Sequence, residues 1–167
     1  MNIKISNFSC DITPPIGHPL CAGWYPPAKA IGDPISAHGI VLQAEGEDAI
    51  VLCALDWAEL SNQDYNRWRE DLARAVNTEA DRVAVHCVHQ HDTPWPDREA
   101  QSLLDEHDCP DVIMAGDWCE RIRANAAVAA RTALEQAELC THISSGEARV
   151  DRIASNRRVM GDDGKVY

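Results

Sequence analysis

Three histidines, a cysteine and an aspartate occur within seven residues in the segment HCVHQHDTPWP, at positions 86–96. If the backbone stays extended to residue 91, the side chains of Cys87, His89 and His91 lie on one face. Two imidazoles at this spacing can both reach one divalent ion, which makes His89 and His91 the candidate site residues. His86 would point the other way, and we interpret it as packed on a helix or exposed to solvent.

A catalytic zinc site usually has three protein ligands and one position for water, whose pKa the ion lowers to about 7. Cys87 could be a third ligand, but hydrolytic sites more often use a histidine or a carboxylate. Asp92 and Asp56 could orient an imidazole as hydrogen-bond acceptors, although Asp56 could equally cap the next turn. We therefore expect the missing ligands to be distant in sequence or outside these residues.

The elements that must position the histidines can be predicted from apolar periodicity. We predict strands over residues 2–10, 36–44, 49–56 and 83–88, and a helix over residues 61–76, where Ser61 and Asp64 resemble a capping box. The order strand, helix, strand is typical of an α/β fold with a mixed sheet and helices packed on its faces. In open sheets of this kind, ligands bind at the carboxyl ends of the strands, where the histidines lie.

The remaining segments carry weaker signals. We predict a second helix over about residues 112–137, with an apolar stripe that includes Trp118 and Ile122, and strand material over residues 141–159 around Gly146. Residues 11–34 contain six prolines and cannot form regular structure, and so long a loop is usually functional. In that loop Gly23 and Trp24 could line a substrate entrance, or Trp24 could cover the core.

Composition limits the class of protein. The chain has 27 acidic and 15 basic residues and a formal charge of −12, which argues against a nucleic-acid partner. The longest apolar run, at residues 49–55, is far shorter than the roughly 20 residues of a membrane span, and the N-terminus lacks the apolar block of a signal peptide. Seven cysteines without a CxxC pair favour reduced thiols. We expect a cytoplasmic protein without a transmembrane segment, forming one domain or a fragment of one over residues 1–167.

Five segments, taken together and in this order, resemble the opening part of the neutral/alkaline ceramidase family. They are CDITPPIGHPLCAGW, DPISAHGIVLQ, AIVLCALDWAEL, VHQHDTP and SNRRVMGDDGKV, and they span nearly the whole chain. The resemblance implies the N-terminal part of a larger α/β catalytic domain. It also implies hydrolysis of the linear amide of N-acyl sphingosines, and hence a role in sphingolipid metabolism, with one zinc held by two histidines, a glutamate and a tyrosine.

The resemblance also implies roles for three residues. His89 would be a zinc ligand, His91 would face the substrate, and Arg157 would stabilise the oxyanion on the scissile carbonyl, although a surface charge explains Arg157 as well. The other three zinc ligands of the family lie beyond the matched stretch. We therefore expect the natural chain to continue past Tyr167, the remaining C-terminal part of the enzyme to complete the site, and residues 1–167 alone to be inactive.

The sequence departs from the family pattern beside the histidines. It has Val-His-Gln-His-Asp-Thr-Pro where the family has Thr-His-Thr-His-Ser-Gly-Pro, which favours metal chemistry over ceramide specificity. The leading hypothesis is a zinc-dependent amide hydrolase acting on a small-molecule or lipid amide. The alternatives are another metal hydrolase, of the amidohydrolase or metallo-β-lactamase type, and a non-catalytic domain that keeps the fold.

Overall fold

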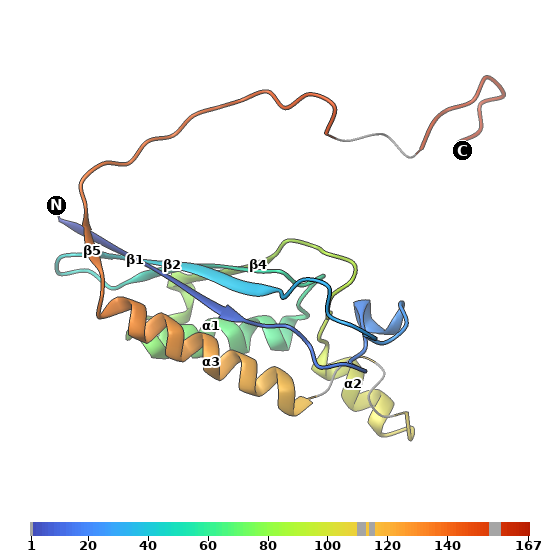
Figure 1. Cartoon of the computed structure of the whole chain (residues 1–167), viewed down its shortest axis with the longest axis horizontal. Coiled ribbons are helices and arrows are strands. Elements are labelled where there is room, and N and C mark those ends of the chain that lie inside the picture. The colour runs from blue at the N-terminus through green and yellow to red at the C-terminus, as the bar shows by residue number, and fades with distance from the viewer. Residues whose placement is uncertain (1, 110–112, 114–115, 154–157) are drawn as a thin grey trace.

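Five strands form one mixed sheet in the order β4-β3-β2-β1-β5. The computed structural model describes residues 2–109, 113, 116–153 and 158–167. The strands are β1 (Ile3–Asp11), β2 (Ser36–Ala44), β3 (Ile50–Leu55), β4 (Val83–Cys87) and β5 (Glu138–Cys140). The helices are α1 (Asn62–Val76), α2 (Arg98–Asp105) and α3 (Gly116–Leu134), and α1 and α3 lie side by side under the sheet (Figure 1).

The pairing of the strands follows from their connections. β1, β2 and β3 pair antiparallel, as expected where the β2–β3 connection is a short turn at residues 45–49. β3 and β4 pair parallel, with Cys53 opposite Val85, because the chain crosses back through α1 between them. The predicted α/β class and mixed sheet are confirmed, and four strands and two helices lie where periodicity placed them.

The core fills the space between the sheet and the helices. Its centre is a cluster of three buried tryptophans: Trp57 after β3, Trp68 in α1 and Trp118 in α3. The ring centroids of Trp57 and Trp68 lie 5.6 Å apart, and those of Trp57 and Trp118 are also 5.6 Å apart. The indole Nε1 of Trp57 donates to the carbonyl of Ile12 at 3.3 Å, so its one polar atom is satisfied. The cluster joins the segment after β3 to helices α1 and α3.

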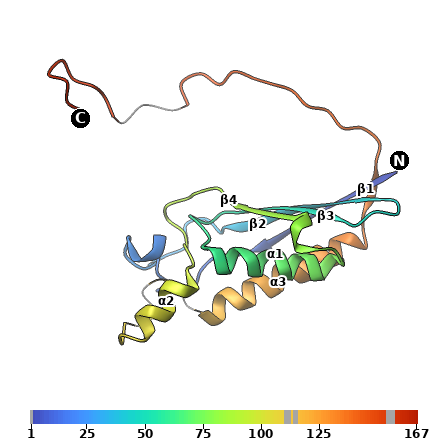
Figure 2. The ribbon, with the colours of Figure 1, turned by 180° about the vertical axis from the view of Figure 1, so that it is seen from behind.

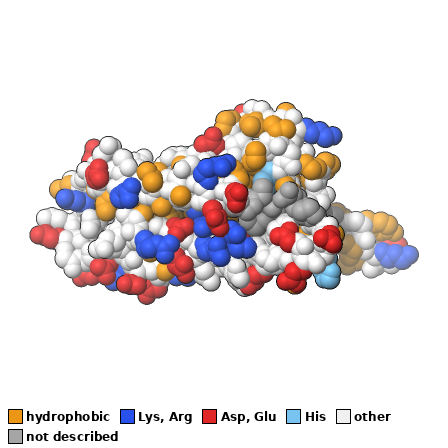
Figure 3. All heavy atoms as spheres, turned by 90° about the horizontal axis from the view of Figure 1, so that it is seen from below, with side chains coloured by type: hydrophobic (Ala, Val, Ile, Leu, Met, Phe, Trp, Pro, Cys, Tyr) orange, Lys and Arg blue, Asp and Glu red, His pale blue; other side chains and the backbone are white. Residues whose placement is uncertain are grey.

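The opposite face of the sheet is open. Helices cover one side only (Figures 1 and 2), and Ile50 and Leu52 on the other side are 42% and 43% exposed. His38 and His86 are exposed on the same face. By contrast, the helical side of the molecule carries acidic and basic side chains interspersed (Figure 3). The two sides therefore differ in character: one is a charged outer surface, the other a partly apolar sheet.

One prediction about secondary structure was wrong, and one helix was not predicted. The strand predicted within residues 141–159 does not form in the described residues 141–153, of which residues 141–150 are exposed and unpaired, while residues 154–157 lie outside the described residues. Only the three residues of β5 pair with β1 at this edge. Without a neighbouring backbone to bond, alternation alone does not make a strand. Helix α2 was not predicted, because its eight residues are too few for a clear apolar period, although Asp97 caps it by accepting from the amide of Ala100 at 3.0 Å.

Among the described residues, no helix has both the length and the apolar character that crossing a bilayer requires.

A substitution at Gly39 would test the packing between β1 and β2. The ring of Phe8 lies across Gly39, and a Cβ at that position would come within 2.2 Å of the ring. We expect Gly39→Ala to lower the free energy of unfolding by about 1–3 kcal/mol through overpacking, and by much less in a Phe8→Ala background. Gly32→Ala is the matched control, because a Cβ there meets no atom within 4 Å. Urea unfolding of the four variants measures this; equal losses in both backgrounds would contradict the packing argument.

Candidate functional site

The histidine loop, residues 88–97, leaves β4 and wraps around the segment that follows β3. The amides of Val88 and His89 donate to the carbonyls of Leu55 and Trp57, at 3.0 and 3.1 Å. Further along the loop the bonds run the other way, with Ala58 N donating to the Pro94 carbonyl at 3.0 Å and Ser61 N to the Pro96 carbonyl at 3.3 Å. The parallel pairing of β3 and β4 brings these two segments together, because both begin at the same edge of the sheet.

The two candidate histidines lie together in this loop. The ring centroids of His89 and His91 are 4.9 Å apart, with the ring planes at 86°. His89 has a positive φ of 66°, so the backbone turns there and is not extended to residue 91 as we had assumed. The rings therefore meet across a turn, and the alternation of a strand does not explain their approach. His86, as expected, is exposed.

The tautomer of the neutral His89 ring follows from its hydrogen-bond partner. Its Nδ1 lies 2.9 Å from the carbonyl oxygen of Ala58. Since a carbonyl only accepts, Nδ1 carries the hydrogen and donates it, and in the neutral ring Nε2 keeps its lone pair. Metal-bound histidines commonly donate the second ring nitrogen to a backbone carbonyl in this way. The contact of His89 with Ala58 is therefore of the kind that orients metal-bound histidines.

Cys87 is a poor third ligand in this arrangement. It is half-buried at the end of β4, and burial, aided by the negative charge of Glu59, raises the pKa of its thiol to about 12. A thiol in this state is neutral near pH 7, whereas metals bind the thiolate. Within the part of the chain that the structure describes, no group of three or more His, Cys, Asp or Glu side chains could hold a metal ion. The described residues thus offer two imidazoles, which is fewer than a catalytic zinc site requires.

Asp56 and Asp92 are the two carboxylates that could have oriented a histidine. Asp56 accepts from the amide of Ser36 at 2.9 Å and so ties the end of β3 to the start of β2. Asp92 is exposed and lines a cavity between the histidine loop and the Pro-rich loop at residues 12–35. The group that orients His89 is the Ala58 carbonyl, which sequence reasoning missed because a backbone oxygen has no residue signature.

Two cavities flank the histidine loop. The smaller, of about 250 Å³, is lined by His89 and Cys87 together with Glu59 and Tyr65. The larger, of about 660 Å³, lies between the histidine loop and the Pro-rich loop at residues 12–35. Its walls are of mixed character: they include the apolar side chains of Leu20, Pro26, Pro27, Ile31 and Ile35 and the polar or charged side chains of Lys29, Asp33, Gln90 and Asp92. A cavity of this size and lining can take a small organic ligand.

The Pro-rich loop lies against the histidine loop. The amide of Cys21 donates to the carbonyl of Thr93 at 2.8 Å, which links the two loops. Trp24 is 77% exposed with its ring 5.9 Å from that of Trp95, so it does not cover the core. Tyr25, which no sequence signal singled out, lies 6.4 Å from the ring of His91. Arg157, the third predicted site residue, lies outside the described residues.

Comparison with known proteins gives one finding, at the level of structure. No family model and no curated protein matches the sequence. A solved structure described as a ceramidase complexed with C2 matches with a TM-score of 0.57 and 11% sequence identity. The match covers 83% of this chain and 22% of that chain, so these residues span less than a quarter of the ceramidase. The likeness establishes a ceramidase-like fold.

Proposed function

We propose that the chain is the N-terminal part of a zinc-dependent, ceramidase-like hydrolase that cleaves a linear amide of a small molecule or a lipid. The observation that carries the proposal is the approach of His89 and His91 at the carboxyl edge of a ceramidase-like sheet. The Ala58 carbonyl holds one of the two rings in the tautomer that a metal ligand needs.

The residues have distinct roles in the proposal. His89 would hold the zinc through Nε2, because its Nδ1 is engaged with Ala58. The ion, when bound, would lower the pKa of a water molecule to about 7. His91 would contact the reacting amide and move a proton to or from it. Arg157 would donate hydrogen bonds to the oxygen that becomes negative as the carbonyl is attacked.

The remaining zinc ligands would come from a part of the natural protein outside residues 1–167. Two observations support this part of the proposal: the described residues hold fewer ligands than a catalytic zinc requires, and the match spans only 22% of the ceramidase. The open face of the sheet, with the side chains of Ile50 and Leu52, is a surface that such a portion could cover. The substrate class rests on the fold similarity and on the cavity beside the histidine loop, whose walls combine apolar and polar side chains.

Zinc content of the natural full-length protein tests the ligand assignment. We expect about one zinc per chain in wild type, and loss of that zinc in His89→Ala, because a first ligand cannot be replaced from the described residues. His38→Ala is the matched control: it removes the same kind of side chain from the open face of the sheet, away from the two cavities that flank the histidine loop, and should leave the zinc content unchanged. Retention of zinc in His89→Ala would refute the assignment.

Thermal unfolding with added zinc separates the proposed enzyme from a non-catalytic domain that keeps the fold. A metal that binds only the native state must raise the melting temperature. If zinc raises it in wild type and not in His89→Ala, the metal site is supported. No rise in wild type would favour the non-catalytic domain.

Alkylation tests whether Cys87 is a ligand. A rise of its pKa from 9.0 to about 12 lowers the thiolate fraction near pH 8 by about a thousandfold. We therefore expect iodoacetamide to modify Cys87 far more slowly in the native protein than after unfolding in urea, with equal rates before and after zinc is removed by a chelator. Faster modification after chelation, measured on the Cys87 peptide by mass spectrometry, would instead indicate a zinc-bound thiolate.

A further inference from the structure

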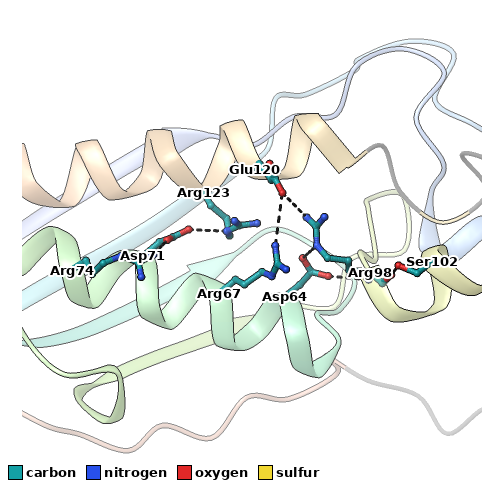
Figure 4. Close-up of polar contacts among 8 residues, drawn as sticks. All are labelled: Asp64, Arg67, Asp71, Arg74, Arg98, Ser102, Glu120 and Arg123. Carbon is teal, nitrogen blue, oxygen red and sulfur yellow. Dashed lines mark hydrogen bonds and ion pairs between the residues drawn. The ribbon is translucent and has the colours of Figure 1, made fainter.

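Asp64 is a buried carboxylate whose partner is not the one that its sequence pattern predicts. It lies in the first turn of α1 and is 2% exposed. The Ser61-x-x-Asp64 spacing predicts a capping box, but the Ser61 side chain makes no capping bond. Instead Asp64 Oδ2 accepts from the backbone amide of Arg98 at 3.0 Å, and Oδ1 lies 3.8 Å from Arg98 Nε (Figure 4). The carboxylate therefore holds the first residue of another helix.

The guanidinium of Arg98 depends on this carboxylate. Its side chain is 21% exposed and lies between Asp64 and Glu120, with Nη2 3.5 Å from Glu120 Oε1 (Figure 4). Its Nε and Nη2 atoms are buried and make no hydrogen bond of normal geometry, so the ion pairs are what compensates their charge. Glu120 is itself 53% exposed, which makes it the weaker partner. Removing Asp64 would leave a mostly buried cation without its buried counter-charge.

Arg98 is the residue that directly follows the histidine loop and begins α2. The other end of the loop is continuous with β4, where backbone pairing fixes it to β3. Between the two ends, Pro94 and Pro96 are fully buried and their carbonyls accept from the segment after β3. The loop is thus held at its start by the sheet and at its end by Asp64, and the two imidazoles lie in between.

We propose that Asp64 is a positioning residue for the histidine site. By holding Arg98, its carboxylate fixes the C-terminal end of the histidine loop and keeps His89 against the Ala58 carbonyl. The inference deepens the proposed function and rests on it only for the zinc measurement, because the position of His89 can be observed without metal.

The chain offers a matched control. Asp71 lies on α1 two turns after Asp64 and pairs with Arg123 of α3, with 2.8 Å between Oδ2 and Nε (Figure 4). Arg123 is 9% exposed, so this pair is also largely buried. It joins the two long helices, and no bond of this pair reaches the histidine loop in the described structure. Asp71→Ala therefore destabilises the same layer without touching the loop.

The experiment is nitrogen NMR of the natural full-length protein with ¹⁵N-labelled histidine, in wild type, Asp64→Ala and Asp71→Ala. In wild type we expect His89 to show a single tautomer with the hydrogen on Nδ1. In Asp64→Ala we expect its two ring signals to move towards the average of both tautomers, because the bond to Ala58 is weakened. Asp71→Ala should lower the melting temperature and leave the His89 signals unchanged. Asp64→Asn keeps an acceptor for the Arg98 amide, so its His89 signals should lie between those of wild type and Asp64→Ala. It takes the place of Asp64→Ala if that variant does not fold.

Two results would overturn the inference: unchanged His89 signals in the folded Asp64 variants, or an equal change in Asp71→Ala, which would indicate general destabilisation. Zinc affinity gives a separate readout, for which we expect about a tenfold weakening in Asp64→Ala and none in Asp71→Ala. If wild type binds no zinc but Asp64→Ala shifts the His89 signals, the proposed function fails and the positioning role stands. If wild type binds zinc and the signals do not move, the positioning role fails alone.

Discussion

The parallel pairing of β3 with β4 is the constraint on which the candidate site depends. Parallel strands end at the same edge of a sheet, so the segment after β3 and the segment after β4 leave the sheet side by side. Neither segment is a strand, and their backbone groups would otherwise lack partners. They satisfy one another, with amides of the histidine loop bonded to carbonyls after β3 and the reverse further along. The position of the imidazoles is a consequence of this exchange of hydrogen bonds.

The tryptophan cluster supports the same region from below. Trp57 belongs to the segment that receives the histidine loop: its carbonyl accepts from His89 and its ring packs on Trp68 of α1 and Trp118 of α3. A large buried ring has few alternative positions in a close-packed core. The backbone that orients His89 is therefore anchored by the core itself, and the helices that complete this core also carry the charges that hold Arg98.

The two faces of the sheet have different parts in the structure. One face, with the helices, builds the core and supports the site. The other face leaves Ile50 and Leu52 partly exposed, and the described residues 141–150 extend over that side without pairing to a strand (Figures 1 and 2). Antiparallel sheets commonly leave one face to solvent, and here every pairing except that of β3 with β4 is antiparallel. The unpaired segment and the open face are consistent with the small share of the ceramidase that these residues span.

The sequence by itself determined the α/β class, the positions of the first four strands along the chain, the two long helices and the pair of histidines, because each depends on local periodicity or on residue type. It did not determine the order of the strands in the sheet, or α2, which is too short to show a period, or the absence of a strand in the described residues 141–153, which depends on whether a partner strand is present. Only the tertiary structure decided how the histidines meet. Asp92 is the carboxylate nearest to His89 in the sequence, yet Ala58, 31 residues away, orients His89 through a backbone oxygen, and Asp56 accepts from the amide of Ser36. The same holds for Asp64, whose spacing from Ser61 indicates a local cap, whereas burial against α2 gives it a partner 34 residues distant. Contacts of this kind are set by which chain segments the sheet brings together, and no local pattern records them.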